Sequence, residues 1–265
     1  MKRRAGERDI TYDDVGAGTP VVLLHPFPFN RRYWAPVAAA LASPSRRVIS
    51  VDAPGFGESE TGGPFTVADW ADDVAALLDQ LDLAAAAVVG MSMGGYAALA
   101  LAARHRARLS AVVLADTRAA ADSPETRRAR AEAIALLNSA GVDTYLARSL
   151  PRLLAPEAPP AVLAQARALA EDRADRLLAG IAALRDRPDR TAELPALRCP
   201  TLVLAGARDQ VIPPEEMRGM SAAIPGARLA ILERAGHLSS LEEPAPFLAA
   251  VRGFLDQAGA PGAAR

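Results

Sequence analysis

The chain has 265 residues, 51% of them hydrophobic, and its 30 basic and 31 acidic side chains leave a net charge of −1. This balance argues against a surface for nucleic acid or for an anionic membrane, and no run approaches the ~18 apolar residues that a membrane span needs. The single cysteine, Cys199, excludes an internal disulfide framework and a cysteine-only metal site. The charged start, MKRRAGERDI, has no apolar segment behind it, so we predict no signal peptide and a cytoplasmic location.

Short apolar runs and longer helical patterns alternate along most of the chain. A run at 7–14 alternates in polarity and predicts an antiparallel edge strand. Between the later runs lie helical patterns, one of which begins with the capping-box spacing of Thr66 and Asp69. The alternation predicts a doubly wound α/β fold with a mostly parallel sheet. Six runs without polar alternation predict strands covered on both faces, and they lie at 20–25, 47–52, 86–90, 111–116, 201–206 and 227–232.

Residues 118–191 break this alternation, because they contain no strand-like run. A helix is predicted from an N-cap at Ser123 to Gly141, and further helical patterns follow it. We therefore divide the chain into an α/β core, at 1–117 and 192–265, and a helical cap inserted between two core strands. An insertion at the carboxyl edge of such a sheet lies near the crevice where ligands bind.

An isolated serine stands between a predicted strand and an alanine-rich helix. The sequence Gly90-Met91-Ser92-Met93-Gly94 fits the pattern G-x-S-x-G, in which a sharp strand-to-helix turn exposes the serine hydroxyl. Flanking glycines let neighbouring backbone approach without a Cβ clash. The helix N-terminus places N–H groups and a positive dipole end beside the serine. The pattern predicts a nucleophile at Ser92, and the alternative is a tight helix–sheet contact that tolerates serine.

A serine nucleophile needs a base, and the chain has three histidines. His105 ends the helix that follows Ser92, where a cationic side chain is favoured by the helix terminus. His25 belongs to the loop after the first core strand. His237 follows the last strand and a glycine, at the position where a side chain enters the crevice above the sheet. We therefore favour His237 as the base.

Two aspartates compete for the role of the acid that orients this base. Asp209 lies just after the strand at 201–206, and Asp116 ends the strand at 111–116. The chain order of nucleophile, acid and base expected for this arrangement favours Asp209. Asp116 would then cap the entry to the insertion or line the pocket.

Five segments together resemble the α/β-hydrolase family, and they extend over nearly the whole chain: LLHPFPFNRRYW, DAPGFGES, VVGMSMGGYAALALA, LVLAGARDQVIPP and ERAGHLSSLEEP. Within that family, the sequence is most similar to bacterial 3-oxoadipate enol-lactonases and small carboxylesterases. The resemblance implies that Ser92 attacks a carbonyl, that His237 takes the serine proton, and that Asp209 fixes the imidazole tautomer.

The same resemblance implies an oxyanion hole made of two backbone N–H groups. One belongs to Met93, after the nucleophile, and the other to Phe27 in the loop HPFPF, where the family usually has His-Gly. Pro26 replaces that glycine and carries no N–H, which leaves Phe27 as the donor by position. Further candidates for the substrate pocket are His25, Asn30, Trp34 and Asp116, although Asn30 and Trp34 could equally pack the loop.

The remaining motifs favour structural interpretations. Gly55 and Gly57 in DAPGFGES do not have the spacing of a phosphate loop. The arginine-rich runs at 127–130 and 173–187 contain interleaved acids and are interpreted as solvated helix faces. Cys199 precedes a strand and is interpreted as a buried, inert thiol. No cluster predicts a metal site, and the mechanism needs no cofactor.

The function predicted from these features is hydrolysis of a small-molecule carboxylic ester or lactone by a serine hydrolase. C–C bond hydrolysis or cofactor-free perhydrolysis on the same three residues is the alternative, and a non-catalytic sensor of small ligands is a remote one. Specificity should lie in the helical cap, where arginines such as Arg118, Arg127 or Arg148 could pair with a substrate carboxylate. The expected partner is a small molecule, with neither nucleic acid nor membrane, and the oligomeric state stays open.

Overall fold

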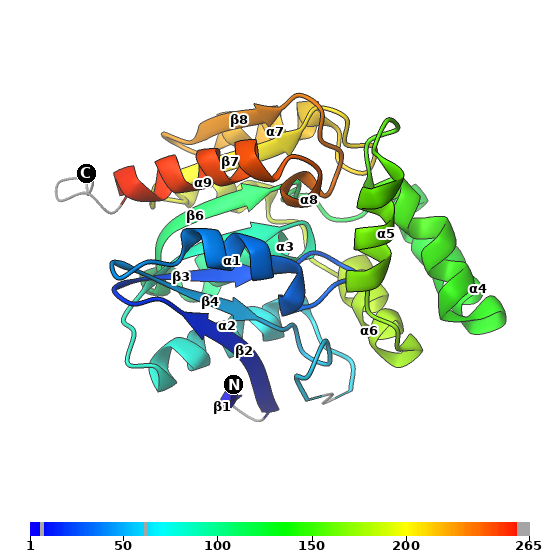
Figure 1. Ribbon diagram of the computed structural model, residues 1–265, viewed down its shortest axis with the longest axis horizontal. Helices are drawn as coiled ribbons and strands as arrows, with labels where there is room; N and C mark the ends of the chain where they lie inside the picture. Colours follow the sequence, from blue (N-terminus) through cyan, green and yellow to red (C-terminus); the bar gives the residue numbers. More distant parts are fainter. Residues whose placement is uncertain (6–7, 61–62, 259–265) are drawn as a thin grey trace.

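The computed structural model describes residues 1–5, 8–60 and 63–258. Its centre is a sheet with the strand order β1-β2-β4-β3-β5-β6-β7-β8, in which every pair from β4 to β8 is parallel (Figure 1). This confirms the mostly parallel α/β fold, with all six predicted core strands in place. The strands are β1 Lys2–Ala5, β2 Arg8–Val15, β3 Thr19–Leu24, β4 Arg46–Val51, β5 Ala86–Met91, β6 Leu109–Ala115, β7 Thr201–Gly206 and β8 Arg228–Leu232.

One strand was not predicted. The run expected to form the antiparallel edge is β2, which pairs antiparallel with β4, but β1 pairs antiparallel along its outer side. The edge prediction is therefore wrong by one strand. The sequence of β1, KRRA, has no apolar alternation, so only its backbone pairing with β2 defines it as a strand.

Helices cover both faces of the sheet. In Figure 1, α1 and α9 lie in front of the strands, and α2 and α3 lie behind them. Helix α2 begins with the predicted capping box, because the Thr66 side chain accepts from the Asp69 N–H at 3.1 Å and the Asp69 carboxylate accepts from the Thr66 N–H at 2.7 Å. The helices outside residues 118–191 are α1 Ala35–Leu41, α2 Val67–Gln80, α3 Met93–Arg104, α7 Pro214–Ala223, α8 Ser239–Glu242 and α9 Pro244–Ala258, with short 3₁₀ turns η1 Arg31–Trp34 and η2 Arg106–Arg108.

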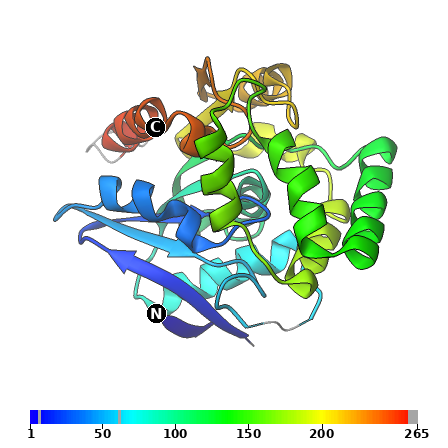
Figure 2. The same cartoon turned by 45° about the vertical axis from the view of Figure 1, so that its right-hand side comes forward.

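Residues 118–191 form helices and contain no strand, as predicted. Figure 2 shows these helices as a separate group, and in Figure 1 the parallel strands point toward them. Gly141 has φ +80° and ψ 175°, so α4 is two helical stretches joined at a kink, and the predicted helix end lies at that kink. The elements are α4 Pro124–Ser149, η3 Leu150–Leu153, α5 Pro160–Leu169 and α6 Ala174–Arg185, followed by η4 Thr191–Ala196. We call residues 118–191 the helical segment.

The interpretation of 173–187 as a solvated face is wrong at its last residue. Arg187 is only 3% exposed, and its guanidinium donates to the buried Asp122 carboxylate at 2.5 Å and to the Ala120 carbonyl at 3.0 Å. The same guanidinium lies 4.2 Å from the centre of the Tyr96 ring. A buried charge needs such partners, so this ion pair joins the two ends of the helical segment to α3.

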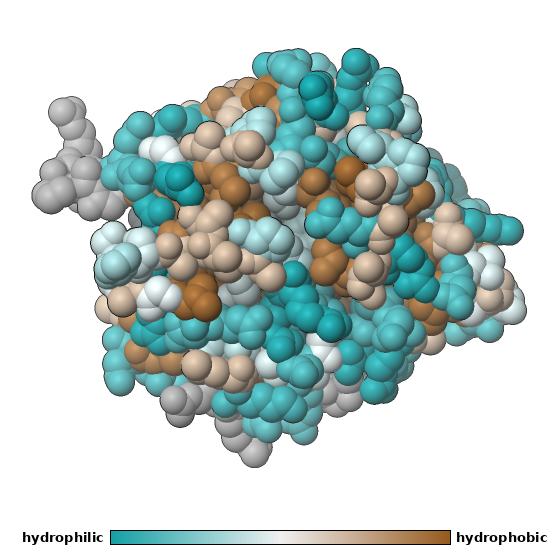
Figure 3. All heavy atoms as spheres, viewed as in Figure 1, coloured by the Kyte–Doolittle hydropathy of each residue, from teal (hydrophilic) through white to brown (hydrophobic). Residues whose placement is uncertain are grey.

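The outer surface is mixed. The face in Figure 3 is largely hydrophilic, with separate hydrophobic patches. Large hydrophobic side chains are exposed at Met1, Val15 and Leu229 among the residues that the structure describes. No helix in these ranges combines the length and the apolar character required to cross a membrane.

Candidate active site

Ser92 lies in the turn between β5 and α3, in an unusual backbone conformation. Its φ of 49° and ψ of −112° are strained for a residue with a Cβ atom. Several hydrogen bonds hold it there. Its N–H donates to the Ala115 carbonyl at 2.9 Å, and its carbonyl accepts from the Gly95 N–H and from the Thr117 hydroxyl, each at 2.9 Å. The surrounding structure therefore determines the direction in which the Ser92 side chain projects.

The two glycines of the motif allow three backbone segments to meet at this turn. A Cβ atom on Gly90 would collide with the backbone of Gly94, and a Cβ atom on Gly94 would collide with the carbonyl of Leu24 at the end of β3. Any side chain at either position would push the strands and α3 apart. The sequence pattern G-x-S-x-G is thus explained here by close backbone approach.

His237 and Asp209 complete a chain of hydrogen bonds to Ser92. The Nε2 atom of His237 lies 2.8 Å from Ser92 Oγ, and its Nδ1 atom lies 2.7 Å from Asp209 Oδ2. The other oxygen of Asp209 accepts from the N–H groups of Val211 at 2.7 Å and Ile212 at 3.0 Å. All three side chains are buried. In a neutral imidazole, Nδ1–H donates to the carboxylate, which leaves Nε2 to accept the hydroxyl proton.

The surroundings of His237 favour its charged form. Burial by itself lowers the pKa of His237, but the charge of Asp209 and its hydrogen bond raise that pKa above the ordinary value. A raised pKa and a hydroxyl 2.8 Å away are the two features that a general base at this position would need.

Asp116, the competing acid, has other hydrogen-bond partners. It is fully buried, accepts from the Gly206 N–H at 2.8 Å, and shares a short hydrogen bond with the Ser239 hydroxyl. Burial first, and then the charge of Asp209, raise its pKa to about 8. The described contacts thus join the imidazole to Asp209, while Asp116 stands beside that pair as a carboxyl that stays mostly protonated at neutral pH.

The two N–H groups expected at the oxyanion hole have no described protein acceptor. Within residues 1–5, 8–60 and 63–258, no hydrogen bond joins the N–H of Phe27 or of Met93 to another protein atom. Met93 is the first residue of α3, where helical N–H groups lack intrahelical acceptors. Both groups are therefore available to bind an oxygen of a ligand.

His25, which was a candidate for the substrate pocket, makes structural contacts in the loop after β3. Its Nε2 accepts from the Ala53 N–H at 2.9 Å, and its Nδ1 lies 3.1 Å from the Pro26 carbonyl. The ring packs between Phe56 and Trp70, with centroids 5.6 and 5.0 Å away. Burial lowers the pKa of His25 to about 4, so it is a neutral side chain that ties the loop after β3 to the loop after β4.

Asn30 and Trp34 also pack the loop. The Asn30 side chain accepts from the Arg32 N–H at 3.1 Å and so caps η1. Trp34 is fully buried, with its ring centre 6.0 Å from that of Phe247 and 5.2 Å from that of Tyr33. Of the two interpretations left open for these residues, the contacts favour packing.

The helical segment is attached to the loops around Ser92 by residues that sequence reasoning missed. The Glu171 N–H donates to the Pro28 carbonyl at 2.8 Å, and the Glu171 carboxylate accepts from the Gly57 N–H at 3.0 Å. Glu171 also pairs with Arg176 and is only 4% exposed. It stands in the charged run EDRADR, where nothing local distinguishes a buried acid from a solvated one. Ser239, by contrast, lies two residues after His237 and could have been found by that proximity.

No group of three or more His, Cys, Asp or Glu side chains in the described ranges is arranged to hold a metal ion.

Comparison with known proteins identifies a family whose model matches most of the chain. A family model described as the alpha/beta hydrolase fold matches residues 19–244. A thermophilic esterase from Thermogutta terrifontis, solved with malate bound, superimposes with a TM-score of 0.91 at 35% identity, over 98% of this chain and 99% of that one. The enol-lactonase from Burkholderia xenovorans LB400 superimposes with a TM-score of 0.87 at 31% identity, over 97% and 100% of the chains. RutD from Caulobacter sp. (strain K31), provisionally named a carbamate hydrolase, is 36% identical over 233 residues, 84% of this chain and 85% of RutD.

The raised pKa of Asp116 predicts a pH-dependent cost to stability. Between its ordinary value near 3.8 and the folded value of about 8, the folded protein holds a proton that the unfolded chain has released. The cost therefore grows as pH rises through this window. Relative to Asp116→Asn, we expect the wild type to lose roughly 3–4 kcal/mol of unfolding free energy between about pH 5 and pH 8.

Urea denaturation of both proteins across that range would measure this difference. Asp143→Asn, which changes a 91% exposed carboxylate, is the matched control and should follow the wild type. A difference in unfolding free energy between wild type and Asp116→Asn that does not change with pH would contradict the raised pKa of Asp116.

Proposed function

The chain belongs to the α/β-hydrolase fold family, and we propose that it is a serine hydrolase that cleaves a small-molecule carboxylic ester or lactone. The observation that carries this proposal is the hydrogen-bonded series Ser92, His237 and Asp209, with its two distances of 2.8 and 2.7 Å. A buried hydroxyl, imidazole and carboxylate in this order is the arrangement that activates a serine for acyl transfer.

In the proposed mechanism, His237 Nε2 takes the hydroxyl proton as Ser92 Oγ attacks the carbonyl carbon of the substrate. The resulting oxyanion accepts from the N–H groups of Met93 and Phe27, which have no other described acceptor. His237 then gives the proton to the leaving alkoxide, and an acyl-enzyme remains. Water, deprotonated by the same imidazole, attacks the acyl-enzyme and releases the carboxylic acid and Ser92.

We further propose that the helical segment is a cap over the reacting groups. The rings of Phe27 and Phe56 press against α6 at Gly180, where any Cβ atom would meet them within 3 Å. The backbone N–H of His237 donates to the Leu153 carbonyl at 3.1 Å, so the end of η3 is bonded to the residue that carries the imidazole. A substrate acyl group would therefore contact apolar residues of this segment as well as the core.

The ester or lactone class is supported by the solved relatives, an esterase and an enol-lactonase that align over nearly the full chain.

Of the three arginines considered as partners for a substrate carboxylate, Arg118 is the one whose charge acts on His237. Its guanidinium also donates to the Val211 carbonyl at 2.6 Å and pairs with Glu216 at 3.3 Å. The similarity to RutD adds a carbamate to the substrates that a test must include.

Acid release in a pH-stat, with wild type beside Ser92→Ala, tests the proposal directly. The panel contains short and medium acyl esters, neutral lactones, an enol-lactone with a carboxylate and a carbamate. We expect turnover of an ester or lactone and a loss of at least ~10³-fold in Ser92→Ala, because the nucleophile is removed. A tenth or more of the wild-type rate in pure Ser92→Ala would refute the nucleophile. Turnover of no substrate by folded wild type would favour C–C cleavage, perhydrolysis or ligand sensing.

Asp209→Asn should lose far more activity than Asp116→Asn. Only Asp209 bonds to His237 Nδ1, so the amide at this position disturbs the imidazole tautomer, and we expect a loss of at least ~10²-fold in kcat. Asp116→Asn keeps an acceptor for the Gly206 N–H and a group for Ser239. Steady-state kinetics on the preferred substrate would measure both, and the reverse order would transfer the role of the acid to Asp116.

Glu171→Ala should lower kcat while KM changes little, since the Glu171 carboxylate holds the Gly57 N–H and the neighbouring Phe56 ring packs against Phe27. We expect a loss of roughly 10-fold, the scale of a small misplacement of a catalytic group. Glu171→Gln keeps an acceptor oxygen for the Gly57 N–H and should recover most of the rate. Asp175→Ala, in an exposed ion pair with Arg173, is the control. A purely structural role for Glu171 would lower the unfolding free energy without changing kcat per folded molecule.

A further inference from the structure

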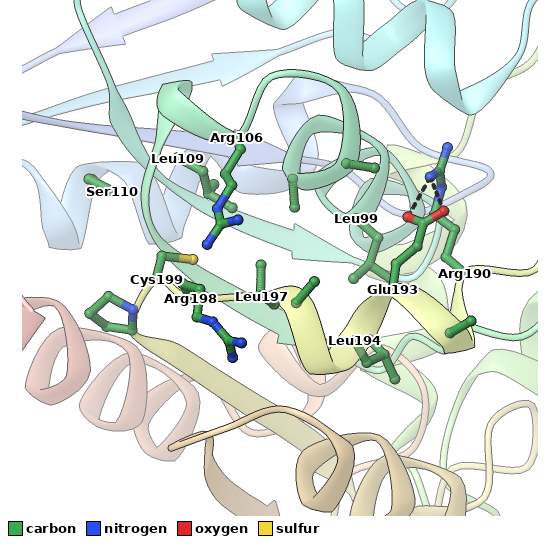
Figure 4. A pocket seen from close by; sticks show the side chains of 15 residues that line it. Leu99, Arg106, Leu109, Ser110, Arg190, Glu193, Leu194, Leu197, Arg198 and Cys199 are labelled. Carbon is green, nitrogen blue, oxygen red and sulfur yellow. Dashed lines mark hydrogen bonds and ion pairs between the residues drawn. The ribbon is translucent and has the colours of Figure 1, made fainter. Parts of the chain in front are cut away.

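A cavity lies at the amino ends of the parallel strands, on the side of the sheet opposite to Ser92. It has a volume of about 710 Å³ and is bounded by the end of α3, by η2 and η4, and by the starts of β6 and β7 (Figure 4). Ser92, Asp209 and His237 follow the carboxyl ends of their strands, whereas β6 and β7 begin at this cavity. A volume of this size lies within the usual range, about 300–1,000 Å³, for small-molecule sites.

The cavity has an apolar floor made of four leucines, which are at most 8% exposed although they line a surface cavity: Leu99, Leu109, Leu194 and Leu197. Small side chains from α3 and η4, including Ala102, Ala103 and Ala196, extend this lining. No aromatic side chain is among the described lining residues. The lining therefore suits an aliphatic chain better than a flat ring system that would stack on an aromatic face.

Two cations at the cavity lack an acidic partner. Arg106 and Arg198 are both exposed; among the described residues the Arg106 guanidinium has no hydrogen bond or ion pair, and that of Arg198 donates only to the Pro195 carbonyl at 2.8 Å. Figure 4 shows both side chains near Cys199, with Arg190 and Glu193 further along. The Glu193 carboxylate is already bonded to Arg190, at 2.7 and 3.0 Å. The part of the cavity near Cys199 thus carries positive charge that its own residues do not neutralise.

We propose that this cavity binds an amphipathic monoanion, a carboxylate with an unbranched aliphatic chain of medium length. The carboxylate lies between Arg106 and Arg198, since guanidinium groups match its two oxygens, and the chain lies along the buried leucines. A neutral ligand would gain nothing from the two exposed guanidinium groups, and a short anion such as acetate would leave the floor uncovered. The site is separate from Ser92 and does not depend on the proposed hydrolysis.

The single cysteine of the chain provides a reporter inside the cavity. Cys199 lines it and is partly exposed, so the interpretation of this residue as a buried thiol is wrong. Burial raises the pKa of the thiol, so its reaction with a neutral disulfide reagent such as 4,4′-dithiodipyridine should be slow enough to follow. A ligand that fills the cavity covers the sulfur and slows this reaction, whereas a ligand beside Ser92 at the other edge does not.

The test measures the rate of Cys199 modification against decanoate concentration. We expect saturable protection in wild type and in Ser92→Ala, with a maximal slowing of about fivefold or more. In Arg106→Gln/Arg198→Gln, the decanoate concentration for half protection should rise at least about tenfold. Arg128→Gln/Arg218→Gln removes the same charge from exposed arginines of α4 and α7 and should behave as wild type. Each variant is compared with its own rate without decanoate, because Arg106 also acts on the thiol.

Three results would overturn the proposal. Decanoate could fail to protect Cys199, or the uncharged decanol could protect it equally, or the double glutamine variant could keep the wild-type concentration dependence. Protection that increases with protein concentration in the absence of decanoate, together with a dimer in size-exclusion chromatography, would assign the cavity to a second copy of the chain instead.

Discussion

The strained backbone of Ser92 is the constraint on which the rest of the site depends. A φ of 49° persists only because strand, helix and neighbouring strands meet closely enough to enforce it. That approach requires Gly90 and Gly94, since any Cβ atom there would collide with backbone. It also requires the carbonyl of Ala115 at the end of β6, which accepts from the Ser92 N–H. The packing of these backbone segments therefore also determines the direction of the Ser92 hydroxyl.

Two buried aspartates near one histidine would repel each other if their surroundings were alike. They differ in their hydrogen bonds. Asp209 accepts from two backbone N–H groups, and its other oxygen lies 2.7 Å from His237 Nδ1. Asp116 is more deeply buried and accepts from one backbone N–H, so it takes up the proton that relieves the repulsion. The raised pKa of Asp116 thus follows from its burial and from the charge of Asp209 beside it.

Local patterns were sufficient to predict the core strands, the serine turn and the positions of Ser92, Asp209 and His237 after three strands. Each buried strand, and the motif G-x-S-x-G, consists of residues that are adjacent in the sequence. They were insufficient where a partner far along the chain decides the outcome. The strand β1 exists only through its pairing with β2. Arg187 and Glu171 stand in runs of charge that look solvated, yet Asp122 and the loop at Gly57 bury them. Periodicity contains no information on such pairs, so the contacts of the helical segment could not be predicted.

The loop that carries Phe27 shows how a departure from the usual family residue can be accommodated. Proline at position 26 removes a donor, but its carbonyl accepts from the Phe29 N–H at 3.0 Å and lies 3.1 Å from His25 Nδ1. The next proline carbonyl, Pro28, accepts from Glu171 of the helical segment. The acceptors on both sides of Phe27 are thus engaged within the protein, while its own N–H is not. A loop stiffened by proline and bonded at both neighbouring carbonyls can hold one unbonded donor in place, which is the property an oxyanion site requires.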